Sequence, residues 1–171
     1  IRDCAALGYL DPDGHTLDPT YGLGRWWTLW RPARLARHDI DPAKAPDGPM
    51  DFTALDYPDD HFSAVVFDPP YKLNGTGGSH PSDGGYGVAW QGVRRDNKHD
   101  LVRAGLVECI RVTRPGGYVL AKGKDQVESG RKRWQVRMIV EHAEAHCCTH
   151  VDSLHVRSYV PQPKGRRQVH A

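Results

Sequence analysis

Hydrophobic residues follow two periods along the chain, and each period predicts a different element. Short apolar runs rich in β-forming residues, such as SAVVF at 63–67, have no helical spacing and predict buried strands. Longer segments with apolar residues three or four positions apart, such as 100–117, predict amphipathic helices. Because the two kinds of segment alternate, we expect an α/β fold with a mostly parallel sheet and right-handed crossovers.

Turn signals and apolar spacing place the elements in chain order. Predicted strands open residues 15–24 and occupy 36–42, 50–55, 63–67, 118–124 and 149–160, and predicted helices occupy 24–37, 100–117 and 131–146. Pro32 should kink or end the first helix, and the Pro-Gly-Gly sequence at 115–117 should end the second. Residues 72–97, rich in glycine and small polar groups, are expected to form a flexible loop that faces the substrate.

The sequence FDPPY at 67–71 places a stiff turn directly after the strand at 63–67. Neither proline ring offers a ladder N–H, so the sheet cannot continue there, and ligands bind at the carboxyl ends of strands in open α/β sheets. Asp68 and the carbonyl of Pro69 can accept both hydrogens of one amino group, and Tyr71 can stack on a planar base. Two acceptors on one exocyclic amine draw its nitrogen toward tetrahedral geometry and free the lone pair for attack. An ordinary turn with proline at its centre is the alternative.

A second turn follows the first predicted strand, in the sequence LDPTYGLG at 17–24. Its two glycines would let the backbone approach a ligand closely, although an ordinary strand–helix turn is the alternative. Downstream, Asp39 could grip ribose hydroxyls at the end of the second strand, with Asp41 as a competitor for that role. Asp51 could meet an adenine amino group. Surface acids that cap turns are the alternative for these carboxylates.

Length and composition fit one globular domain with a single core. The chain has 171 residues, of which 39% are hydrophobic and 26% are charged. No apolar stretch approaches the length of a membrane span and no secretory signal opens the chain, so we expect a cytoplasmic protein without a membrane partner. The four cysteines lack pairable or zinc-type spacing, which favours reduced thiols. His142 and His146 share a helical face near Cys147, but no catalytic pattern lies between them, and no metal is expected.

The net charge of +2 hides an uneven distribution of charge. Residues 1–70 carry 6 Lys and Arg against 12 Asp and Glu, whereas residues 71–171 carry 17 against 9. An acidic half with a small-ligand site and a basic half suit a protein that faces a polyanion on one side, and chance clustering on solvated faces is the alternative. The basic stretch 130–137 could contact phosphates or form an exposed helix face.

The two turns together resemble the amino-methyltransferases that use S-adenosylmethionine to methylate exocyclic nitrogens of DNA bases. Their cofactor motif reads D-P-x-x-G-x-G and their catalytic motif D/N/S-P-P-Y/F/W, and LDPTYGLG and FDPPY match these motifs within a resemblance that covers roughly residues 15–125. It implies a class I methyltransferase sheet, which is Rossmann-like. The residues implied to hold the methionine part of the cofactor are Asp18, Pro19, Thr20, Gly22 and Gly24, with Asp39 on its ribose beside the expected adenine contact of Asp51. The residues implied to hold the flipped base are Asp68, Pro69, Pro70 and Tyr71.

We therefore expect a single methyltransferase domain over 1–171, with S-adenosylmethionine as cofactor and nucleic acid, DNA in the first place, as partner. Adenine N6 is favoured over cytosine N4, because Asp in the first motif position is commoner among adenine enzymes. An RNA guanine-N2 methyltransferase shares the catalytic motif. A catalytically silent nucleic-acid-binding subunit is a third interpretation, since no long segment remains for a separate target-recognition domain. The last strand of such a sheet is unaccounted for after Tyr159, so the domain could lack it.

Overall fold

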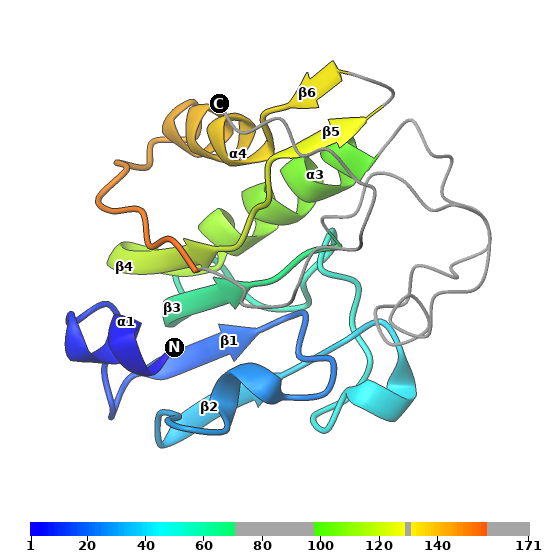
Figure 1. Ribbon diagram of the computed structural model, residues 1–171. Helices are drawn as coiled ribbons and strands as arrows, with labels where there is room; N and C mark the ends of the chain where they lie inside the picture. Colours follow the sequence, from blue (N-terminus) through cyan, green and yellow to red (C-terminus); the bar gives the residue numbers. More distant parts are fainter. Residues whose placement is uncertain (71–97, 129–130, 157–171) are drawn as a thin grey trace.

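The computed structural model describes residues 1–70, 98–128 and 131–156, and its centre is a four-stranded sheet. The strands lie in the order β2 (Arg34–Arg37), β1 (His15–Asp18), β3 (Phe62–Phe67) and β4 (Thr113–Ala121). Each neighbouring pair is parallel, and Figure 1 shows the four arrowheads pointing the same way. The predicted α/β class, a Rossmann-like parallel sheet flanked by helices, is confirmed.

Helices and a small hairpin complete the described part of the chain. The α-helices are α1 (Arg2–Ala6), α3 (Lys98–Arg111) and α4 (Gln135–Glu144), the 3-10 turns are η1 (Arg25–Trp27) and η2 (Pro42–Lys44), and the antiparallel hairpin consists of β5 (Gln126–Glu128) and β6 (Arg131–Arg133). Figure 1 shows α3 and α4 on the β3–β4 side of the molecule. Within the described ranges, no helix has both the length and the apolar character to cross a membrane.

The sheet carries an apolar core on each face, because side chains alternate in direction along β3. Val65 and Phe67 belong to a cluster that includes the buried residues of α3. Val66 belongs to a second cluster on the opposite face, where it packs with Trp27 of η1 and partly buried residues of α1. Every residue of β3 except Ser63 is buried, so this strand and the turn after it have a rigid support.

The helix predicted over 24–37 is wrong. Gly24 has a left-handed backbone with φ 66°, and only the 3-10 turn η1 follows before β2 begins at Arg34. The tryptophans that suggested an amphipathic helix instead cover the second face of the sheet, with Trp27 buried and both Trp26 and Trp30 partly buried. The apolar spacing therefore predicted correctly that these side chains are at least partly buried, but it predicted the wrong backbone geometry.

Residues 50–55 do not form the predicted strand. The Asp51 carboxylate accepts the backbone N–H of Thr53 at 2.9 Å and its hydroxyl at 2.7 Å, which closes a turn. Phe52 packs on Phe67 with the ring centroids 5.2 Å apart, so its apolar side chain reaches the core from a loop. The prediction failed because the local side-chain bond competes with strand pairing.

Other boundaries also differ from the prediction. Helix α3 ends at Arg111, and the Pro-Gly-Gly sequence at 115–117 lies inside β4, where the pairing with β3 is irregular. Residues 131–133 form β6 rather than the first turn of the predicted helix, which begins at Gln135. Within the predicted strand at 149–160, the described residues 149–156 form no strand. All four cysteines are free, and Cys147 has a left-handed backbone after the end of α4.

Candidate functional site

The candidate site lies at the carboxyl edge of β1 and β3, which are adjacent in the sheet although β2 separates them in the chain. From β1 the chain crosses to β2 on one side, and β3 lies on the other side of β1. Such a change of direction opens a crevice at the carboxyl ends of the strands, where open α/β sheets bind ligands. The two turns that the sequence singled out, 18–24 and 68–71, begin at this edge.

In the turn after β1, the carboxylate of Asp18 is buried and fully engaged. Its Oδ1 accepts the backbone N–H of Thr20 at 2.9 Å and the Thr20 hydroxyl at 3.3 Å, and its Oδ2 accepts the indole N–H of Trp27 at 2.7 Å. Burial raises the pKa of Asp18 to about 7, with a further upward contribution from the charge of Asp68, against the lowering effect of these hydrogen bonds. Asp18 is only 4% exposed, so its carboxylate stabilises the turn from the inside and offers little surface to a ligand.

The glycines of this turn are required by its backbone. Gly22 has φ 56° and Gly24 has φ 66°, a left-handed conformation that other residues rarely adopt. A side chain at Gly22 would have no atom nearer than 3.8 Å to its Cβ and would project into open space. A Cβ at Gly24 would instead meet the Tyr21 hydroxyl at 2.6 Å. The two positions therefore differ, since only Gly24 is closely covered by a neighbouring side chain.

Asp39 and Asp51, the other predicted cofactor contacts, have different surroundings. Asp39 lies just after β2, and its Oδ2 accepts the backbone N–H of Gly22 at 3.0 Å, while its Oδ1 accepts that of Asp41 at 2.9 Å. The structure therefore brings Asp39 together with the glycine turn. Asp41 caps η2 through the N–H of Ala43, and Asp51 is exposed and caps its own turn.

In the turn after β3, Asp68 is mostly buried, and only one of its two carboxylate oxygens has a hydrogen-bond donor in the described part of the chain. Its Oδ2 lies 3.0 Å from the ammonium of Lys122, whereas its Oδ1 is buried and accepts no hydrogen bond from any described residue. Its backbone N–H donates to the Thr20 hydroxyl at 2.9 Å, so Thr20 links this turn directly to Asp18. Pro69 is buried and Pro70 is partly buried.

Burial raises the pKa of Asp68 above its ordinary value, and the charge and hydrogen bond of Lys122 act against that shift. The indole of Trp26 also lowers the pKa, although it forms no hydrogen bond of ordinary geometry with the carboxylate. A carboxylate with one buried oxygen left over is uncommon in folded proteins, where buried polar atoms are nearly always paired. The free acceptor is what an amine-binding site needs.

Sequence reasoning missed Lys122 and Trp26. Lys122 follows β4 directly, its backbone N–H donates to the carbonyl of Phe67 at 2.9 Å, and its ammonium lies 5.1 Å from the ring centroid of Trp26. The available signal was a lysine towards the end of the predicted strand at 118–124. Only the strand order, which places β4 next to β3, shows that this lysine lies near the DPPY sequence. Tyr71 and the predicted loop at 72–97 lie outside the described residues.

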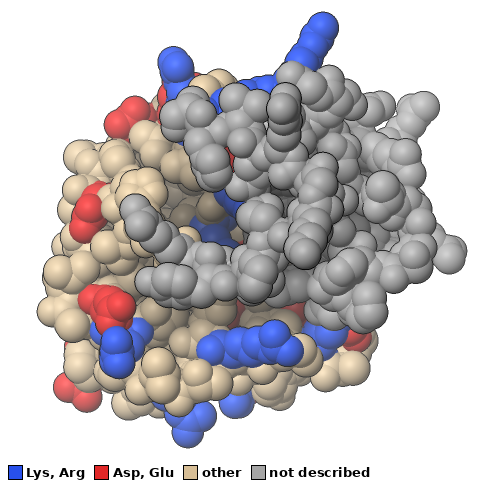
Figure 2. Space-filling view, in the orientation of Figure 1, with Lys and Arg blue, Asp and Glu red and all other residues tan. Residues whose placement is uncertain are grey.

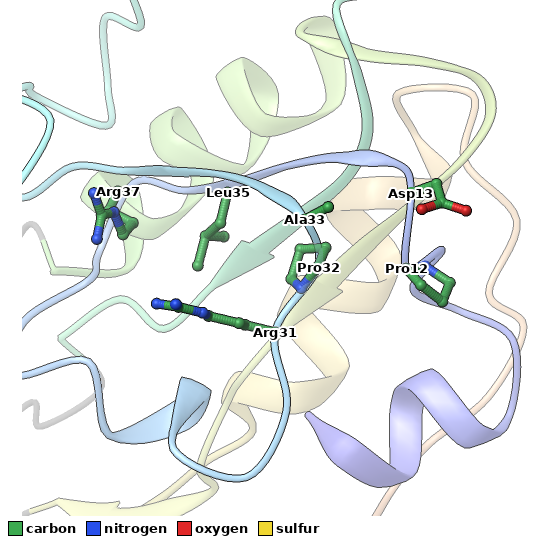
Figure 3. A pocket seen from close by; sticks show the side chains of 7 residues that line it. All are labelled: Pro12, Asp13, Arg31, Pro32, Ala33, Leu35 and Arg37. Atoms are coloured by element: carbon green, nitrogen blue, oxygen red, sulfur yellow. The ribbon is translucent and has the colours of Figure 1, made fainter.

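Other features lie apart from these turns. A surface pocket runs along β2, with the Arg31 and Arg37 guanidinium groups at one end and Asp13 at the other, and its lining contains none of the predicted site residues (Figure 3). The rings of His142 and His146 lie 4.4 Å apart between centroids, and no group of three metal-ligating side chains occurs in the parts of the chain that the structure describes. Neither feature contributes to the carboxyl edge of β1 and β3.

The β5–β6 hairpin concentrates positive charge shortly after Lys122. All three residues of β6 are exposed, and the Lys132 ammonium lies 3.7 Å from the ring centroid of Trp134, which is 51% exposed. The hairpin is anchored to the chain beyond β4, because the backbone N–H of Lys124 donates to the buried Gln135 side chain at 2.9 Å. Where Figure 2 shows described residues away from its upper edge, Lys and Arg side chains lie among Asp and Glu side chains.

Comparisons with known proteins give matches to solved structures only. No family model matches the sequence, and no curated protein matches it. The [4+2]-cyclase SpnF is 17% identical with a TM-score of 0.48, over 80% of this chain and 52% of that one. A protein of Pyrococcus horikoshii is 15% identical with a TM-score of 0.46, over 85% of this chain and 58% of that one. An S-adenosylmethionine-dependent methyltransferase of Thermotoga maritima, a possible histamine N-methyltransferase, is 15% identical with a TM-score of 0.39, over 74% and 50%.

The chain thus spans about half the length of the solved structures that it matches. At these identities and scores, the matches carry no argument about the reaction or the substrate. The geometry of the two turns is the guide to both.

Proposed function

We propose that this protein is an S-adenosylmethionine-dependent methyltransferase that acts on an exocyclic amino group of a DNA base, with adenine N6 favoured over cytosine N4. The observation that supports this most is the buried, unpartnered Oδ1 of Asp68 in the sequence DPPY, at the end of β3 and linked through Thr20 to the glycine turn of β1. An amine that donates one hydrogen to this oxygen would satisfy a polar atom for which the described residues supply no donor.

The turn after β1 has the features that the cofactor requires. Gly22 leaves open space where any side chain would project, and the nearby Asp39 carboxylate has lone pairs beyond those used by two backbone N–H groups. In this proposal the turn formed by Asp18, Pro19, Thr20, Gly22 and Gly24 holds the methionine part, and the already engaged carboxylate of Asp18 acts by fixing the shape of that turn. Asp39 would hold the ribose and Asp51 the adenine. When bound, S-adenosylmethionine supplies a sulfonium methyl group, whose transfer to nitrogen leaves a neutral thioether and releases one amine proton.

The turn after β3 would hold and activate the amine. Asp68 Oδ1 and the Pro69 carbonyl accept its two hydrogens, while Pro70 keeps the turn rigid and Tyr71 stacks on the base. A negative carboxylate is most valuable as the nitrogen gains positive charge, so it lowers the barrier more than it strengthens ground-state binding. The Thr20 hydroxyl, which accepts the Asp68 N–H, fixes the distance between this turn and the cofactor turn.

Nucleic acid as the partner is supported by the β5–β6 hairpin. Exposed Arg131, Lys132 and Arg133 provide charges for phosphates, and Trp134 offers a flat surface next to them. The hairpin begins four residues after Lys122 in the chain, and the hydrogen bond between Lys124 and Gln135 closes its base, so a nucleic-acid strand bound to the hairpin would lie near the segment that carries Lys122. Binding of this kind should weaken steeply with salt.

Two other functions remain as alternatives. An RNA guanine-N2 methyltransferase would use the same acceptors for the same kind of amine. A catalytically silent nucleic-acid-binding subunit would have no need for a buried carboxylate oxygen without a partner, which is a costly feature to keep.

Mass spectrometry of nucleosides tests the proposal. The protein is incubated with methyl-labelled S-adenosylmethionine and, separately, with unmethylated duplex DNA, single-stranded DNA and RNA, and each product is digested to nucleosides. We expect label in N6-methyladenine from DNA. Label in N4-methylcytosine would change the assigned substrate to cytosine, and label in N2-methylguanine from RNA would favour the RNA enzyme. Salt-dependent binding without label in any nucleoside would favour the silent subunit.

A further inference from the structure

We infer that Lys122 is a positioning residue for the proposed reaction: its ammonium keeps Asp68 ionised and holds Oδ2, so that Oδ1 remains the acceptor for the substrate amine. The inference rests on the proposed function, because it assigns a role within that same site. It is carried by the contacts of Lys122 on both its backbone and its side chain.

The backbone of Lys122 is fixed relative to Asp68. Its N–H donates to the carbonyl of Phe67, the residue before Asp68, at 2.9 Å, which extends the parallel pairing of β3 and β4 to the edge of the site. The side chain then returns to the same turn and places its ammonium 3.0 Å from Asp68 Oδ2. The ammonium also lies 5.1 Å from the ring centroid of Trp26, within the range of a cation–π contact.

The groups around Asp68 leave Lys122 as the cation that opposes its protonation. Among the described residues, the ionisable or polar groups that face Asp68 are Asp18 at the end of β1, Thr20 in the turn, Trp26 in η1 and Lys122 after β4. Asp18 and Asp68 repel each other when both are ionised, and burial adds to that cost. A protonated Asp68 would carry no charge to offset the positive charge that develops on the nitrogen.

A purely structural ion pair would behave differently. The Lys122 side chain is 36% exposed and that of Asp68 18% exposed, so an Asp68 that loses its cation can take up a proton rather than remain charged and unpaired. Loss of the ammonium should therefore leave the fold intact and change mainly the ionisation of Asp68. This separates a positioning role from a stabilising one.

The test follows the ionisation of Asp68 directly. Protein containing 13C-carboxyl aspartate is titrated by NMR, the Asp68 signal is assigned from its loss in Asp68→Asn, and wild type is compared with Lys122→Met, Lys122→Gln and Lys122→Arg. Removal of an opposite charge at this distance should raise the Asp68 pKa by about one unit or more, and Lys122→Arg should restore most of the shift. Lys124→Met, two residues further on, is the matched control and should leave the titration unchanged.

Activity provides the second readout. In Lys122→Met and Lys122→Gln, the acidic limb of the methyl-transfer rate should move to higher pH by the same amount, while the rate at alkaline pH persists. An unchanged Asp68 titration in both variants would overturn the inference even if the wild-type protein methylates DNA. Absence of methyl transfer by the wild type would refute the proposed function instead, and the NMR titration would still show whether Lys122 controls the charge of Asp68.

Discussion

The turns after β1 and β3 each carry a buried aspartate at the same edge of the sheet, yet the two carboxylates have different partners. Asp18 has three hydrogen-bond donors, two from Thr20 and one from Trp27. Asp68 has one, the ammonium of Lys122, which leaves Oδ1 without a donor among the described residues. The first turn is therefore complete by itself, and in the proposed function the substrate amine would supply the donor that the second turn lacks.

This difference separates two kinds of buried acid. A carboxylate whose oxygens all have hydrogen-bond donors from its own chain fixes the shape of a turn. In Asp18, burial disfavours the charged form and raises the pKa to about 7. A carboxylate held on one oxygen is fixed in position and keeps an acceptor on its other oxygen that the described residues do not use. Thr20 contacts both acids, so the turn that is shaped by Asp18 also sets the position of Asp68.

The largest expected effect concerns the turn after β1. Gly22→Val should abolish binding of S-adenosylmethionine and of its demethylated product, because the side chain would enter open space at the site and strain a backbone with φ 56°. Calorimetry with the product nucleoside measures this.

Gly8→Val is the matched control, since Gly8 also has a positive φ, 84°, and a Cβ at that position would have no atom within 4 Å, but it lies after α1. It should carry the same kind of strain and keep its affinity. Equal affinity of Gly22→Val and wild type would remove this turn from the cofactor site.

A smaller effect should appear in the pH dependence of stability. The pKa of Asp18 is about 7 in the folded protein and near 4 in the unfolded chain, so the folded state binds the proton more tightly. The contribution of Asp18 to stability is therefore fully present below the unfolded value and is lost as pH rises toward about 7, at up to roughly 1.4 kcal/mol per pH unit. Chemical denaturation at several pH values measures this slope.

Asp18→Asn should lose that contribution to the slope, although its amide would also weaken the contact with the Trp27 donor. Asp47→Asn serves as a control of opposite sign, because Arg37 lowers the pKa of Asp47 and its contribution is lost as pH falls. A wild-type slope retained in Asp18→Asn would mean that Asp18 is an ordinary ionised acid and that the contrast between the two turns is wrong.

The sequence predicted the parts of the site that depend on neighbouring residues. The apolar run at 63–67 determines a strand locally, the strand ends before the prolines that follow it, and Gly22 and Gly24 mark left-handed backbone directly. Asp39 lies beside the glycine turn because it follows the adjacent strand, and its contact with the ribose stays a prediction.

The remaining features depend on contacts between distant segments. Lys122 reaches Asp68 only because β4 pairs with β3. Similarly, Trp27 contributes to the turn after β1 because its indole N–H donates to the Asp18 carboxylate. The spacing of the tryptophans fits a helix as well as a covering loop, so periodicity alone could not distinguish them. Asp51 was assigned to adenine without knowledge that its carboxylate caps its own turn.

The central claim is that Asp68 holds the reacting amine, and single-turnover methyl transfer with saturating cofactor tests it most directly. Asp68→Ala should keep the fold and the cofactor affinity and transfer the methyl group about 10²–10³-fold more slowly than wild type. Asp68→Asn keeps an acceptor oxygen, so its rate should lie between those of wild type and Asp68→Ala. Asp3→Ala, in the exposed helix α1, should match wild type. If Asp68→Ala transfers the methyl group as fast as wild type, the carboxylate at the end of β3 does not act in the reaction.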